Sequence, residues 1–91
     1  MDIYDTWKLY KQKMEVYITE FNKANHENDF PAMTKAKDST KNVYLKFIEL
    51  LKLERQSDQE AFREALDAFK ADIKKMSEYI KNNEGRKILN N

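Results

Sequence analysis

The first third of the chain carries a regular stripe of large apolar residues. Its members recur at alternating intervals of four and three residues, which is the heptad spacing of a single helix face. They are Ile3, Trp7, Tyr10, Met14, Tyr17, Phe21 and Ala24. Residues 25–29 are polar and of types that favour turns and helix caps. The pattern predicts a helix over about residues 3–26 with one buried face.

A second apolar stripe begins just after Pro31. Asp29 or Asn28 is a candidate N-cap for this segment. A proline in the first helical turn removes no hydrogen bond, because the first amides of a helix have no intrahelical partner. The positions that share one face are Met33, Ala36, Thr40, Val43, Tyr44, Phe47, Leu50 and Leu51. We expect a helix over about residues 30–54, with Thr40 as a polar position inside its apolar face.

A third stripe occupies the C-terminal part of the chain. Residues 57–60 read Ser-Asp-Gln-Glu, a capping-box pattern in which the first and last side chains bond each other's backbone amides. The heptad positions that follow are Phe62, Leu66, Phe69, Ile73, Met76 and Ile80. Gly85 is a residue type that commonly ends helices. The pattern therefore predicts a helix over about residues 58–84 and a tail over 85–91.

Three helical segments joined by short connectors predict an all-α fold. Residues 1–91 are few enough that we expect one domain with one core. Long helices with short connections pack antiparallel, so the leading expectation is an antiparallel three-helix bundle. The alternative is a helical hairpin that dimerises to a four-helix bundle. That arrangement requires the second and third helices to fuse through residues 55–58.

Composition narrows the class of protein. The chain has one Gly, one Pro and no Cys, so it lacks the turn residues of a β-rich fold and the ligands of a thiolate metal site. Its mean hydropathy is -0.93, and no apolar run has the length of a transmembrane helix. The N-terminus has no signal-peptide pattern. We therefore expect a small cytoplasmic protein with no membrane segment.

The sequence contains few patterns that indicate a catalytic or metal-binding site. The chain contains no phosphate-binding loop, HExxH or GxSxG motif. The only histidine, His26, lies beside Glu27 and Asp29 in a polar connector, a setting more typical of solvated side chains than of metal ligands. Aromatic residues at heptad spacing indicate core packing. We expect a protein that is not an enzyme and that has no metal, cofactor or small-molecule substrate.

Apolar residues outside the three stripes indicate a surface that binds protein. Leu9 and Val16 project together from the first helix, opposite its stripe. Leu45, Ile48 and Leu53 lie off the stripe of the second helix. Exposed apolar positions with charged neighbours are typical of protein interfaces. The sequence thus favours a protein-binding module, either a homo-oligomer or an inhibitor, immunity, adaptor or regulatory factor, and its composition resembles small phage and mobile-element proteins.

Lysines of the second helix favour a competing function. Residues 30–55 contain six basic residues against three acidic ones, a local charge of +3 in a chain whose net charge is +1. Lys37, Lys41 and Lys52 project within about 60° of one another at about 100° per residue. They are candidate contacts for the phosphates of a nucleic acid. Because many helices have a lysine-rich solvated face, this pattern ranks below the protein interface.

Overall fold

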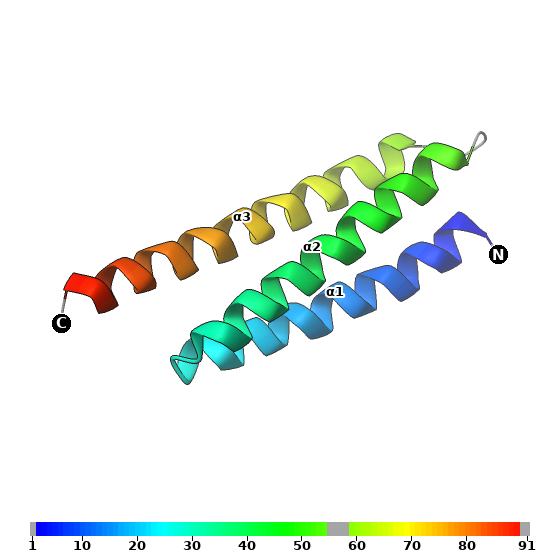
Figure 1. Cartoon of the computed structure of the whole chain (residues 1–91). Helices are drawn as coiled ribbons and strands as arrows, with labels where there is room; N and C mark the ends of the chain where they lie inside the picture. Colours follow the sequence, from blue (N-terminus) through cyan, green and yellow to red (C-terminus); the bar gives the residue numbers. More distant parts are fainter. Residues whose placement is uncertain (1, 55–58, 90–91) are drawn as a thin grey trace.

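The protein is built from three long helices. The computed structural model describes residues 2–54 and 59–89, which contain α1 (Ile3–His26), α2 (Phe30–Leu53) and α3 (Gln59–Leu89) and no strand. Successive helices reverse direction, and α2 packs against both α1 and α3 (Figure 1). The predicted antiparallel three-helix bundle is confirmed. No helix in the described ranges is both long enough and apolar enough to cross a bilayer.

Local hydrogen bonds define the turn between α1 and α2. Asn28 has a φ of 58°, in the left-handed region that ends many helices. Its N–H donates to the Asn25 carbonyl at 3.2 Å, and the Asp29 N–H donates to the Ala24 carbonyl at 2.8 Å. These are the two bonds of a Schellman motif. The Asp29 carboxylate then accepts from the Ala32 N–H at 3.1 Å, so the predicted N-cap of α2 is confirmed.

The predicted end of the third helix was wrong. Helix α3 continues through Gly85 to Leu89, and Gly85 does not have a positive φ. Glycine inside a helix costs only about 1 kcal/mol relative to alanine, which one residue within a long run of intrahelical hydrogen bonds can sustain. Residues 85–89 of the expected tail are therefore helical. The predicted capping box begins at Ser57, which lies outside the described residues.

Residues of the three predicted stripes pack into two core clusters, one toward each end of the bundle. Near the α1–α2 turn, Phe21, Ala24, Met33, Ala36, Met76 and Ile80 form one buried cluster. At the other end, Ile3, Phe47, Leu51, Phe62 and Leu66 form a second cluster. Each cluster takes residues from all three helices. Burial of such side chains contributes about 1.5–3 kcal/mol each, so these contacts hold α3 against the α1–α2 hairpin.

Aromatic rings hold the second cluster together. The Trp7 ring of α1 lies 4.9 Å from the Phe47 ring of α2 and 5.8 and 5.9 Å from Phe62 and Phe69 of α3, measured between centroids. Tilted and edge-on arrangements at these distances are favourable beyond the area that they bury. The aromatic residues of the stripes therefore form core, as predicted.

Thr40 is fully buried at the middle of the bundle. Its hydroxyl donates to the Ala36 carbonyl one turn earlier at 2.8 Å. A buried hydroxyl without a partner costs roughly 1–3 kcal/mol, and this bond removes that penalty. The polar position expected within the α2 face is thus accommodated by the helix itself.

Candidate functional site

The outer face of α1 carries the clearest exposed apolar pair. Leu9 is 47% exposed and Val16 is 55% exposed, on the side of α1 opposite its buried residues. Two adjoining open depressions run along this face. Their lining residues are Leu9, Gln12, Lys13, Glu15, Val16, Tyr17, Thr19 and Glu20. The structure therefore brings Leu9 and Val16 together on one surface, which we term the α1 outer face.

The remaining predicted interface residues do not join this face. Leu45 and Leu53 of α2 are exposed, but they lie eight residues apart and project about 80° from each other. Ile48 is half-buried and packs against the core cluster that contains Phe47. Ile48 is less exposed than expected because α3 lies beside the flank of α2 from which it projects, and its role in a protein interface stays a prediction.

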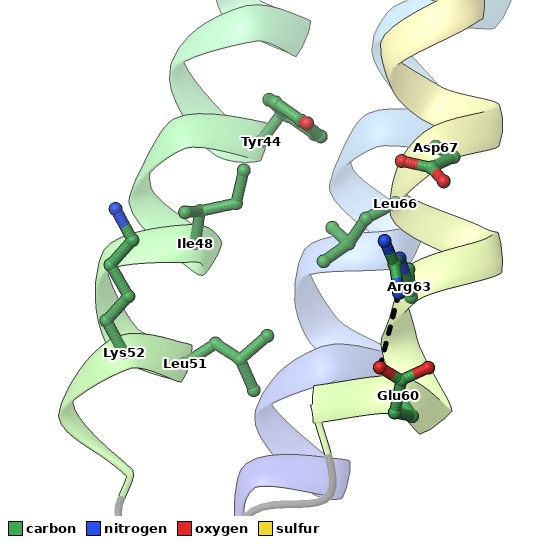
Figure 2. Close-up of a pocket in the computed structure, with 8 residues that line it drawn as sticks. All are labelled: Tyr44, Ile48, Leu51, Lys52, Glu60, Arg63, Leu66 and Asp67. Carbon is green, nitrogen blue, oxygen red and sulfur yellow. Dashed lines mark hydrogen bonds and ion pairs between the residues drawn. The ribbon is translucent and has the colours of Figure 1, made fainter.

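A groove between α2 and α3 was not predicted from the sequence. It has a volume of about 320 Å³. Its lining residues are Tyr44, Ile48, Leu51 and Lys52 of α2 and Glu60, Arg63, Leu66 and Asp67 of α3, as Figure 2 shows. Finding it requires knowing which flanks of the two helices meet, which a stripe on one helix does not reveal.

Charged groups of α3 line one wall of this groove. The Arg63 guanidinium lies 3.3 Å from the Glu60 carboxylate, and both side chains are exposed. Across the groove, burial raises the pKa of the Tyr44 phenol above its ordinary value of 10.0, and the negative charge of Asp67 raises that pKa further. Tyr44 therefore stays protonated at neutral pH and cannot serve as a base there.

The groove residues do not form a catalytic set of a familiar kind. None of the eight is His, Ser, Thr or Cys, so the groove has no triad of the Ser-His or Cys-His kind. Among the described residues, no group of three or more His, Cys, Asp or Glu side chains is placed to hold a metal ion. His26 is exposed at the last residue of α1. The absence of enzymatic activity stays a prediction.

The three lysines singled out on α2 differ in their surroundings. Lys37 forms an ion pair with Asp38 at 2.9 Å, and its side chain is 23% exposed. Lys41 and Lys52 are exposed, and Lys52 also lines the α2–α3 groove. At about 100° per residue, all three project from the same flank of α2 as Ile48, which lines the groove. Their role in binding nucleic acid stays a prediction.

Comparison with known proteins does not assign the chain to a family. No family model, no curated protein and no solved structure matches the chain.

Proposed function

We propose that the protein is a non-enzymatic helical binding module that holds a helix of another protein along the α1 outer face. An adaptor, inhibitor or immunity factor would work in this way. The single observation that carries the proposal is the placement of Leu9 and Val16, two exposed apolar residues two turns apart within one continuous depression. Apolar centres with charged surroundings are typical of protein interfaces.

The spacing of the outward residues supports a helical partner. Asp5, Leu9, Gln12, Val16, Thr19 and Lys23 recur at intervals of four and three along the outer side of α1. This row is a second heptad-spaced seam on the reverse of the buried one, and Leu9 and Val16 are its only apolar members. A heptad seam is the pattern onto which another helix packs. The contact would resemble one more helix added to the bundle.

Charge along α1 disfavours a parallel copy of this chain as the partner, whereas an antiparallel copy would place Lys8 opposite Glu15. Lysines 8 and 13 flank the first half of the seam, and glutamates 15 and 20 flank the second half. In a parallel pair of α1 helices, Lys8 would face Lys13 and Glu15 would face Glu20, so like charges would meet. A partner helix that is acidic opposite the lysines and basic opposite the glutamates avoids this repulsion.

Site-specific crosslinking tests the proposal. A photoreactive amino acid placed at Gln12, between Leu9 and Val16, should form a covalent adduct with one protein in the host cell. The matched control carries the same group at the exposed Glu49 of α2. An adduct formed from Gln12 and absent from Glu49 supports the proposal. Identical adducts from both positions, or none, would overturn it.

Charge insertion provides a second, independent measurement. The double substitution Leu9→Glu and Val16→Glu should abolish the Gln12 adduct and leave folding intact, because both side chains are exposed. The control is Leu45→Glu with Leu53→Glu, which adds the same charge at exposed positions of α2. Light scattering reports self-association in parallel. An adduct that proves to be a second copy of this chain contradicts the foreign partner.

A further inference from the structure

Basic residues of α3 lie on the same flank of the bundle as the lysines of α2. Lys70, Lys74 and Lys81 project within about 40° of one another at about 100° per residue. Arg63 projects in the same direction and lines the α2–α3 groove together with Lys52 of α2. This shared groove places the two rows on one side of the molecule. We term Lys37, Lys41, Lys52, Lys70, Lys74 and Lys81 the α2–α3 lysine face.

The two rows are in register. Helices α2 and α3 run antiparallel, and Tyr44 faces Asp67 across the groove (Figure 2). Three residues before Tyr44 is Lys41, and three residues after Asp67 is Lys70, so these lysines lie at the same level. Four residues further along each helix are Lys37 and Lys74, about 6 Å away along the axes. Four lysines therefore surround one short stretch of the interhelical surface.

Acidic residues neutralise only part of this face. Asp38 pairs with Lys37 at 2.9 Å, whereas Asp67 and Glu78 lie one turn beyond the cluster on either side. Six lysines against three carboxylates leave an excess of three positive charges, and the Arg63–Glu60 ion pair adds none. Within the described chain, Lys41, Lys70 and Lys74 form no ion pair with a carboxylate. Like charges held close together destabilise one another, and an anion bound between them would remove that repulsion.

We propose that the α2–α3 lysine face binds the phosphate backbone of a nucleic acid. Two rows of point charges, spaced at about one to three helical turns, match a ligand that carries a repeating negative charge. The face offers lysine rather than arginine forks and has no exposed aromatic platform, so it contacts phosphates without reading bases. This binding is independent of the α1 outer face, which lies on another helix.

Titration with labelled oligonucleotides tests the proposal. The probes are mixed-sequence duplex DNA, single-stranded DNA and RNA, with a polyglutamate peptide as the non-nucleic-acid polyanion. For about three phosphate contacts with a duplex, affinity should fall roughly 40-fold between about 50 and about 200 mM salt. Absence of salt-dependent nucleic-acid binding at low salt would overturn the proposal. So would tighter binding of polyglutamate than of every nucleic acid.

Matched variants locate the contact. The triple substitution Lys41→Gln, Lys70→Gln and Lys74→Gln should remove about 2.7 units from the duplex salt slope. The control, Lys8→Gln with Lys11→Gln and Lys23→Gln, removes the same charge from exposed positions of α1 and should leave the slope unchanged. Glutamine retains helix propensity, and circular dichroism checks that both variants fold. Equal loss of binding in both variants would show a net-charge effect and refute the assigned face.

Discussion

Tyr44 of α2 and Asp67 of α3 point toward one another across the groove, so the carboxylate opposes ionisation of the phenol (Figure 2). Burial is the larger cause of the raised Tyr44 pKa, and the Asp67 charge is the smaller one. In the unfolded chain Tyr44 has its ordinary pKa of about 10 and releases its proton more readily. The folded state therefore binds more protons than the unfolded state above that pH.

We expect Tyr44 to lower the stability of the protein at alkaline pH. Its contribution is fully present below about pH 10 and is lost as pH rises through the raised folded pKa. Urea denaturation of the wild type and of Tyr44→Phe over this range isolates the effect from lysine titration. The wild type should lose stability relative to the variant. Asp67→Asn should bring the Tyr44 pKa down only partway, and a complete return would contradict burial as the main cause.

Replacing Thr40 with valine should leave stability nearly unchanged or raise it. The hydroxyl donates to a carbonyl that already accepts a backbone bond within α2, so its removal orphans no buried group. Valine keeps the shape of the side chain in the fully buried site. Thr40→Ala instead leaves a void and should cost about 1–2 kcal/mol. Chemical denaturation of both variants measures the difference. A loss for valine as large as that for alanine would show that the hydroxyl bond itself stabilises the core.

Asn28 should tolerate glycine better than alanine. Its φ of 58° carries a steric cost for residues with a Cβ, which asparagine partly avoids and glycine lacks. We expect Asn28→Gly to be neutral or stabilising and Asn28→Ala to cost about 1 kcal/mol, both read from thermal unfolding. Asn25→Ala, three residues earlier in α1, is a helical control that should show little loss. Equal effects of glycine and alanine at position 28 would argue against the left-handed turn.

Gly85→Ala distinguishes a helix interior from a helix end. Because α3 passes through Gly85 with no positive φ, alanine should increase helicity and stabilise α3 by about 0.5–1 kcal/mol. At a left-handed stop, the same substitution would destabilise the protein. Circular dichroism and hydrogen exchange of the α3 amides measure the change. A decrease in either would restore the helix end expected from the sequence.

Heptad spacing located the buried faces because helix periodicity is a local property. All six predicted stripe residues of α3 that begin with Phe62 are buried, and the α1 stripe is buried or half-buried throughout. The end of α3 was misjudged because glycine is also found inside helices when its neighbours sustain the hydrogen-bond ladder. A single residue type is therefore weaker evidence than a repeated spacing.

The exposure of surface residues depended on how the helices pack together, which the pattern along one helix does not show. Ile48 projects about 100° from Phe47, and only the position of α3 decides that it packs at the edge of the core. The lysines of α2 were visible in the sequence. Their alignment with Lys70 and Lys74 needed the antiparallel offset between the two helices. By contrast, Leu9 and Val16 lie opposite a complete buried stripe, so their exposure could be predicted from α1 alone.

The aromatic contacts of Trp7 make its fluorescence an intrinsic probe of how α3 packs against the other two helices. This residue is the only tryptophan in the chain, and its indole touches rings from both other helices. Detachment of α3 would remove two of those neighbours and admit water, while the Phe47 contact within the hairpin could persist. The emission wavelength of the native protein can thus follow the docking of one helix in real time without an added dye.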